Sequence, residues 1–169
     1  SRLLFSNNPT RGADHYREKL TPHGIDIDPA TVLTSATVSA AYLAATHPDE
    51  RVFLVGDGRL EAILEDAAVE LTSDPDAAEV VLGSFDRGFS FETLWDSLRA
   101  LEGGVPFYGT DPDATIPIDE GEIPGTGAIL AAMETVAGRE PDAILGKPSS
   151  VAATAAMDRL DAAPSNTLV

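Results

Sequence analysis

The sequence has no cysteine among its 169 residues. This absence excludes disulfide bonds, thiolate metal sites and cysteine nucleophiles. Histidine is scarce too: His15, His23 and His47 lie in different segments, and none has a second ligand at a metal-site spacing. We therefore expect ordinary surface or helix-end histidines and no histidine metal centre. A reducing cytoplasm is the simplest compartment for such a chain.

Long hydrophobic runs and basic residues are also lacking. No apolar stretch approaches the length of a membrane span, and the first residues lack the basic and apolar regions of a signal peptide. Only 11 basic residues, two of them lysines, stand against 28 acidic ones, which gives a net charge of −17. Because such a charge repels nucleic acid and anionic membranes, we expect neither as a partner. The acidic, lysine-poor composition is similar to that of halophilic proteins from a high-salt cytoplasm.

What is present is an alternation of strand and helix patterns. Buried-type apolar runs predict strands, and each is followed by a segment with helical periodicity. This alternation is typical of an α/β fold with mostly parallel strands. Strands are expected within residues 3–5, 51–58, 78–85, 105–110 and 143–146, helices within 14–24, 35–46, 59–67, 90–101, 127–137 and 148–160, and the start of one more strand at 165–169.

The helix expected at 90–101 carries an apolar stripe that includes the only tryptophan. Phe91, Leu94, Trp95, Leu98 and Leu101 recur at the spacing of one helical face. We expect this stripe to pack in the core, because large apolar side chains at helical spacing are usually buried. A binding platform is the alternative.

Polar groups suited to chemistry follow two of the expected strands. In "LLFSNNPTRG" the apolar run ends at Ser6, and a hydroxyl and a following N–H at such a strand end can both donate to one phosphate oxygen. In "ILGKPSS", Lys147 follows a short strand and a glycine, where it offers a fixed positive charge to a phosphate or carboxylate. A serine that only turns the strand end and a solvated lysine stay open as alternatives.

Both segments, in this order, resemble the haloacid dehalogenase superfamily, and closely its NagD-like branch of 4-nitrophenyl phosphatase and sugar-phosphate phosphatase type. "LLFSNNPTRG" is similar to the second motif of that branch and "ILGKPSS" to the third. The segments between them resemble its large α/β cap. The resemblance implies a partial Rossmann-like core, residues 1–48 and 142–169, with an inserted α/β cap domain at residues 49–141.

The same resemblance implies a phosphatase mechanism. Members of the branch carry a nucleophilic and an acid/base aspartate in a D-x-D-G-T motif before the second motif, and magnesium-binding acids in a G-D motif after the third. Neither is present in these 169 residues at the matching places. The implied reaction is Mg²⁺-dependent hydrolysis of small phosphomonoesters through an aspartyl-phosphate. We expect the metal ligands to lie outside this chain and the 169 residues alone to be inactive.

The resemblance also assigns roles to residues that are present. Ser6 and Lys147 would stabilise the transferring phosphoryl group, and Asn7 and Asn8 would line the phosphate pocket beside them. The cap would close over the site and select the substrate through one loop. The loop residues that match the specificity segment are Asp111, Asp113, Ala114, Thr115 and Ile116, with Asp111 standing where many relatives have asparagine.

Two acidic segments imitate metal sites. Gly56-Asp57, with Glu61 four residues on, is similar to the G-D motif, but it precedes Lys147, whereas the family's motif follows the lysine, so we expect a structural role. The acidic loop 111–122 lacks the ligand spacing and glycine of an EF-hand, and we expect a solvated loop.

The expected partner is a small phosphorylated metabolite, and a homodimer formed through the cap is a further possibility. A different class of function stays open. The chain would then be a non-catalytic α/β module that binds a phosphorylated ligand or a partner chain through the same strand-end donors. In that case Trp95 would belong to an interface.

Overall fold

The structure is a computed structural model that describes residues 2–167. It confirms the α/β class. Its main layer is an all-parallel five-stranded sheet in the order β4-β3-β5-β6-β9. The strands are β3 (Val52–Val55), β4 (Leu71–Thr72), β5 (Val80–Gly83), β6 (Phe107–Gly109) and β9 (Ala143–Ile144).

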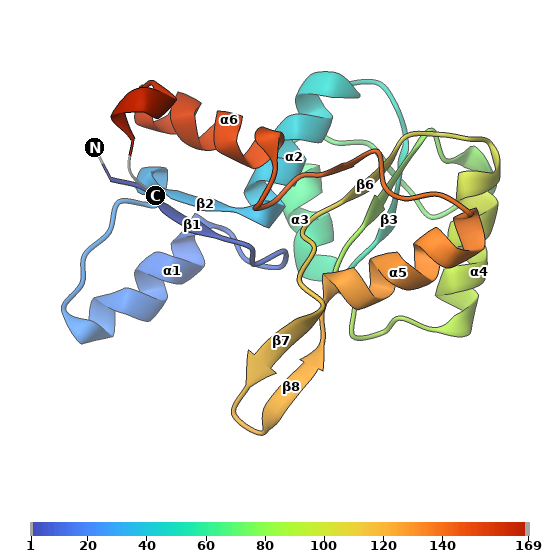
Figure 1. Cartoon of the computed structure of the whole chain (residues 1–169), viewed down its shortest axis with the longest axis horizontal. Helices are drawn as coiled ribbons and strands as arrows, with labels where there is room; N and C mark the ends of the chain where they lie inside the picture. The colour runs from blue at the N-terminus through green and yellow to red at the C-terminus, as the bar shows by residue number, and fades with distance from the viewer. Residues whose placement is uncertain (1, 168–169) are drawn as a thin grey trace.

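Helices cover both faces of this sheet (Figure 1). Alternate side chains of β3 point to opposite faces, as a strand period of two requires. Val52 belongs to the apolar cluster on one face, and Phe53 belongs to the cluster on the other. The first cluster includes side chains of α2 (Ser35–Thr46) and α3 (Gly58–Asp66), and the second includes side chains of α4 (Phe91–Glu102) and α5 (Thr126–Ala137).

A smaller unit lies beside the sheet (Figure 1). There β1 (Leu4–Ser6) pairs in parallel with β2 (Val32–Thr34), and Ser6 is in register with Thr34. An antiparallel hairpin projects from the other part of the molecule (Figure 1). The remaining elements are α1 (Ala13–Leu20), α6 (Ser150–Leu160), the hairpin strands β7 (Thr115–Ile118) and β8 (Gly121–Pro124), and the short 3₁₀ turns η1 (Thr21–His23), η2 (Pro29–Thr31), η3 (Pro75–Ala77) and η4 (Pro164–Asn166).

The packed unit around the five-stranded sheet draws on residues beyond 49–141. Ala36, Ala40 and Leu43 of α2 belong to the cluster on one face, and β9 pairs with β6 at the sheet edge. Both predicted domain boundaries, 48/49 and 141/142, therefore lie within contacts of this unit. The division into core and cap stays a prediction.

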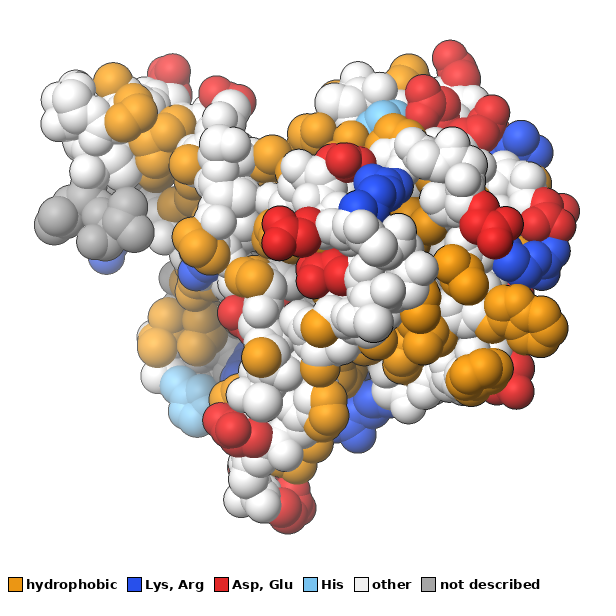
Figure 2. Space-filling model, turned by 45° about the vertical axis from the view of Figure 1, so that its right-hand side comes forward, with side chains coloured by type: hydrophobic (Ala, Val, Ile, Leu, Met, Phe, Trp, Pro, Cys, Tyr) orange, Lys and Arg blue, Asp and Glu red, His pale blue; other side chains and the backbone are white. Residues whose placement is uncertain are grey.

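The prediction for the apolar stripe of α4 is wrong for its two aromatic residues. Leu101 is buried, but Phe91 is 75% and Trp95 60% exposed. The buried face of α4 includes the small residues Ser97 and Ala100. At 100° per residue, Trp95 lies roughly 160° round the helix from Ser97, so it faces away from the sheet. Figure 2 shows exposed hydrophobic side chains on the side of the molecule where α4 lies, and acidic side chains spread widely.

Other expectations differ at the level of single elements. The loop expected at 111–122 overlaps the hairpin β7–β8, which spans residues 115–124, and the short strands β2 and β4 were not expected. The helix expected within 14–24 begins at Ala13, with Gly12 as its N-cap. Residues 164–166 form η4, and the last two residues of the strand expected at 165–169 lie outside the described residues. Among residues 2–167, no helix has the length and apolar character needed to span a membrane.

Candidate active site

The end of β1 and the segment Gly146–Lys147 meet although they lie far apart in the sequence. The side-chain amide of Asn7 binds the backbone of Lys147 twice: its Nδ2 donates to the Lys147 carbonyl at 2.7 Å, and its Oδ1 accepts from the Lys147 N–H at 2.8 Å. Paired amide hydrogen bonds of this kind fix both position and orientation. These two bonds bring the second and third motif segments together.

Gly146 is required for this close approach. A Cβ atom at Gly146 would lie 2.5 Å from the carbonyl oxygen of Thr110 and 3.0 Å from Cβ of Ser35. Because the nearer of these atoms belongs to the backbone, it cannot move aside easily. The glycine before Lys147 therefore allows the third motif to lie against the residue after β6 and the first residue of α2.

The side chain of Lys147 runs along β1. Its ammonium group donates to the carbonyl oxygen of Phe5 at 2.8 Å and lies 5.2 Å from the centroid of the Phe5 ring. An ammonium group has three protons. Two of its protons have no partner among the described residues and can bind an anion, and the cation–π contact helps to hold the charge in place.

Ser6 ends β1, and its hydroxyl oxygen accepts two hydrogen bonds. Tyr16 of α1 donates to Ser6 Oγ at 2.7 Å, and the backbone N–H of Asn8 donates to the same atom at 3.3 Å. With its acceptor positions used, the hydroxyl is left with its proton to donate. Tyr16 was not predicted as a site residue, and the spacing of ten residues between a strand-end serine and a helical tyrosine carries no recognised signal.

Asn8 is held by its own turn. Its Oδ1 accepts from the N–H of Thr10 at 3.0 Å and from the Thr10 hydroxyl at 3.2 Å. This Asx turn keeps the loop after β1 compact. The side-chain nitrogen Nδ2 of Asn8 has no hydrogen-bond partner among the described residues, so it is available to a ligand.

The loop that the resemblance assigned to specificity splits into a buried and an exposed part. Asp111 is only 2% exposed, and its carboxylate accepts from the hydroxyls of Thr110 at 3.1 Å and Thr126 at 2.8 Å and from the N–H of Asp113 at 3.2 Å. Burial raises the pKa of the Asp111 carboxyl to about 6, against the lowering effect of those hydrogen bonds. Asp111 therefore supports the loop from beneath, with its carboxylate shielded from solvent.

The exposed part of the loop reaches the end of β1. The carboxylate of Asp113 accepts from Asn7 Nδ2 at 3.3 Å. Ala114 lies next to Asp113, and Thr115 and Ile116 begin β7, in register with Pro124 and Ile123 of β8. Asp113 is thus the one member of the predicted specificity segment for which the structure gives a contact with the predicted phosphate motifs. Ala114 and Thr115 are exposed, and Ile116 is half-buried.

No group of three or more metal-ligating side chains occurs within residues 2–167. The Asp57 carboxylate is the N-cap of α3, where it accepts from the N–H groups of Arg59 and Leu60, so the structural role predicted for it is confirmed. The residues described here therefore do not by themselves fit the Mg²⁺ site implied by the resemblance.

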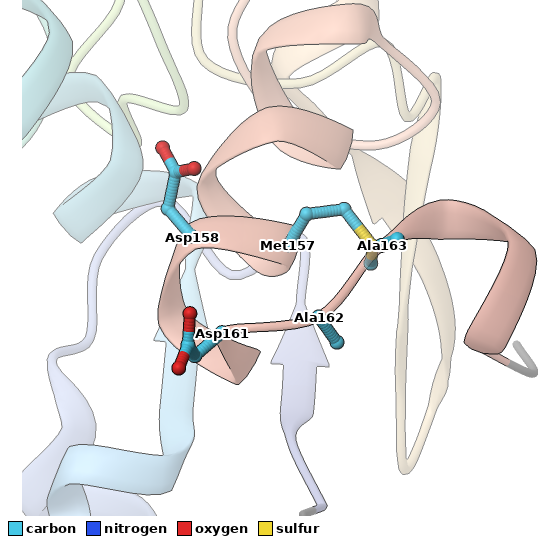
Figure 3. Close-up of a pocket in the computed structure, with 5 residues that line it drawn as sticks. All are labelled: Met157, Asp158, Asp161, Ala162 and Ala163. Carbon is cyan, nitrogen blue, oxygen red and sulfur yellow. The ribbon is translucent and has the colours of Figure 1, made fainter.

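A separate hollow lies at the end of α6 (Figure 3), and residues within 157–163 line it. It has a volume of about 350 Å³, and the carboxyl groups of Asp158 and Asp161 lie on one side of it, with Met157 and Ala163 on the other. None of the predicted site residues lines it. We assign no chemistry to it.

Comparison with known proteins identifies the family. A profile described as haloacid dehalogenase-like hydrolase matches residues 1–70. An acid sugar phosphatase of Staphylococcus epidermidis is 34% identical over 158 residues, which are 94% of this chain and 60% of that protein. The chain belongs to the haloacid dehalogenase-like hydrolases.

Solved structures of the family agree with this assignment. A p-nitrophenyl phosphatase from Archaeoglobus fulgidus is 34% identical with a TM-score of 0.88, and the match covers 95% of this chain and 61% of that protein. A 4-nitrophenylphosphatase from Thermotoga maritima is 30% identical with a TM-score of 0.85 and the same coverage. These similarities confirm the NagD-like branch that the sequence predicted. The chain spans about three fifths of the length of the relatives that it matches.

Proposed function

We propose that this chain supplies the phosphate-binding and substrate-selecting part of a phosphomonoester hydrolase. The observation that carries the proposal is the joining of the two motif segments through Asn7, with one hydroxyl proton of Ser6 and two ammonium protons of Lys147 left unused among the described residues. Donors fixed in this way suit the non-bridging oxygens of a phosphate group.

The substrate class follows from the relatives. Those compared above are named as an acid sugar phosphatase and as nitrophenyl phosphatases. We propose a small phosphomonoester of sugar-phosphate size as the substrate, selected by the exposed residues Asp113, Ala114 and Thr115 and by Ile116 of the same segment. Asp113 is the anionic member of this set, so it would favour neutral or hydroxyl-rich leaving groups over acidic ones.

The residues of this chain act by binding and orienting. Ser6 and Lys147 donate to the transferring phosphoryl group, and their interaction strengthens as negative charge develops on its oxygens. The side-chain amide nitrogen of Asn8, two residues after Ser6, adds a neutral donor. Mg²⁺, when bound, would neutralise charge on the phosphate, but its ligands and the aspartate nucleophile belong to motifs that these 169 residues do not contain. We therefore propose that residues 1–169 alone do not hydrolyse phosphomonoesters.

Hydrolysis of 4-nitrophenyl phosphate with Mg²⁺ tests the proposal. Residues 1–169 should be inactive, and the same chain joined to adjoining gene sequence that encodes a D-x-D-G-T and a G-D motif should be active. In the active protein, Lys147→Ala should reduce kcat/KM by at least about a hundredfold. Lys19→Ala, which removes the other lysine from an exposed position, should change it less than about twofold.

Each alternative result has a separate meaning. Turnover by residues 1–169 that Lys147→Ala abolishes would refute the inactivity of this segment. Binding of inorganic phosphate that depends on Lys147, in a protein without hydrolysis and without the two flanking motifs in its gene, would support a non-catalytic binding module in place of an enzyme.

We also propose that the chain self-associates through α4. The support is the pair Phe91 and Trp95, one helical turn apart and both largely exposed. Paired exposed aromatics are typical of interface anchors. Light scattering should show a dimer for the unaltered chain and a monomer for Trp95→Ser, and a monomer for both would contradict this proposal.

A salt-rich cytoplasm is the proposed setting. The support is the net charge of −17, because self-repulsion of that size weakens as salt screens it. Raising KCl from 0.1 M to 2 M should increase the melting temperature, and a decrease would contradict a halophilic source.

A further inference from the structure

The side-chain amide of Asn7 has no donor left for a phosphate oxygen. An asparagine amide carries two protons on nitrogen and accepts through oxygen. One proton of Asn7 goes to the Lys147 carbonyl at 2.7 Å and the other to the Asp113 carboxylate at 3.3 Å. Its oxygen accepts from the Lys147 N–H at 2.8 Å, and any remaining lone pair on it would repel an anion.

We propose that Asn7 is a positioning residue, through which Asp113 of the hairpin-bearing loop holds Lys147 in place. This role differs from that of its neighbour Asn8, whose amide nitrogen is without a partner among the described residues. The inference rests on the proposed function for its catalytic meaning, because Lys147 matters to phosphate only if the chain binds one.

Asp113 is well held on its own side. Its N–H donates to the buried Asp111 carboxylate at 3.2 Å, and its carbonyl accepts from the N–H of Gly127 at 2.9 Å. A Cβ atom at Gly125 would lie 2.4 Å from the Asp113 carbonyl oxygen, so the loop lies directly on the start of α5. The position of the Asp113 carboxylate therefore follows the position of α5 and of the sheet that α5 covers.

Lys147 is held on the other side by the same amide. Both backbone polar groups of Lys147 bind Asn7, and its ammonium group binds the Phe5 carbonyl two residues before Asn7. A shift of Asp113 away from Asn7 removes one of the three bonds that orient this amide. The Asn7 amide, held only by its two bonds to Lys147, then rotates more freely, and the Lys147 backbone is less firmly oriented.

The first test measures the Lys147 backbone and needs no enzyme activity. Amide hydrogen exchange of Lys147 is followed by NMR in residues 1–169. Asn7→Ser should accelerate this exchange by at least about tenfold, because a partly buried pair of hydrogen bonds is lost. Asp113→Ala, at an exposed position that the fold does not need, should accelerate it about threefold. Asp119→Ala at the exposed hairpin turn is the matched control and should leave it unchanged.

A swap of the two side chains tests their coupling. Asn7→Asp places a carboxylate against Asp113 and against the Lys147 carbonyl, so its effect on exchange should exceed that of Asn7→Ser. Combining Asn7→Asp with Asp113→Asn restores a donor between the two positions and should recover part of the protection. Strictly additive effects would overturn the link between Asp113 and Asn7. Unchanged Lys147 exchange in Asn7→Ser would overturn the clamp itself.

Kinetics in the longer, active protein separate positioning from direct binding. Asp113→Ala should lower kcat by about three- to tenfold through its effect on Lys147, separately from any change in KM caused by its contact with the leaving group. A rise in KM and in the inhibition constant of inorganic phosphate for Asn7→Ser, with Lys147 exchange unaltered, would make Asn7 a phosphate ligand and overturn the proposal. Absence of phosphatase activity with the predicted exchange pattern would overturn the proposed function and leave the clamp standing.

Discussion

The ammonium group of Lys147 donates a hydrogen bond to the backbone carbonyl of Phe5, 2.8 Å away and 142 residues earlier in the chain. The lysine is therefore part of the fold as well as part of the candidate site. Lys147→Met keeps the length of the side chain and removes its charge, so it should lower the free energy of unfolding by about 1–2 kcal/mol. Urea denaturation measures this change. Lys19→Met, at an exposed position, should stay within about 0.5 kcal/mol of the unaltered protein.

Gly146→Ala should be more damaging than its small size suggests. The added methyl would meet the Thr110 carbonyl at 2.5 Å, and the backbone on both sides would have to separate. We expect a loss of about 1–3 kcal/mol in unfolding free energy, together with weaker phosphate binding. Gly12→Ala is the control, because a Cβ there would meet nothing within 4 Å. Equal stability of the two variants would contradict the close approach.

Asp111 makes stability depend on pH. Its pKa rises from 3.8 to about 6 in the folded state, so the folded protein holds a proton that the unfolded protein has released between these values. The protonated carboxyl therefore makes its full contribution to the free energy of unfolding below pH 3.8. This contribution is lost as pH rises through about 6, which lowers the free energy of unfolding by up to about 3 kcal/mol. Asp111→Asn should be more stable than the unaltered chain at pH 7.5, and the difference should vanish near pH 4. A difference that is constant with pH would contradict the shift.

Asp57 should stabilise α3 as its N-cap and should not contribute to binding of Mg²⁺. Its carboxylate accepts from Arg59 N at 2.9 Å and Leu60 N at 3.4 Å. Asp57→Ala should lower unfolding free energy by about 1 kcal/mol, the usual cost of losing an N-cap. In the active protein the Mg²⁺ concentration for half-maximal activity should not change. A large change in that concentration would indicate that Asp57 binds the metal ion.

The sheet and its helices were predictable because buried parallel strands have a simple signature. "VFLV" and "VVLG" are continuous apolar runs, and each is followed by a helical pattern. Strands β2 and β4 were missed because neither lies in a run of three or more apolar residues, the signature that revealed the equally short β1 and β9. The hairpin was missed because Pro117 and Pro124 indicated a loop, whereas an isolated hairpin tolerates proline at its edges.

The candidate site was predictable in its members and not in their roles. Ser6 and Lys147 stand in recognisable motifs, but the two bonds between Asn7 and Lys147 join positions 140 residues apart, and no local pattern specifies them. The burial of Asp111 was unexpected because an aspartate among prolines and acids is usually solvated. The exposure of Trp95 was unexpected because its spacing matches Leu94 and Leu101 only approximately, and the smaller Ser97 and Ala100 define the buried face.

The hairpin β7–β8 is closed at its base by a hydrogen bond of 2.8 Å from the Gly125 N–H to the Ala114 carbonyl. Most side chains of residues 115–124 are exposed, and the hairpin strands pair only with each other. We therefore expect that residues 115–124 can be lengthened, shortened or exchanged without altering the strand order of the five-stranded sheet. Under the proposed function, mutations there should alter the choice of substrate at little risk to folding, as long as Asp113, just outside this segment, is kept.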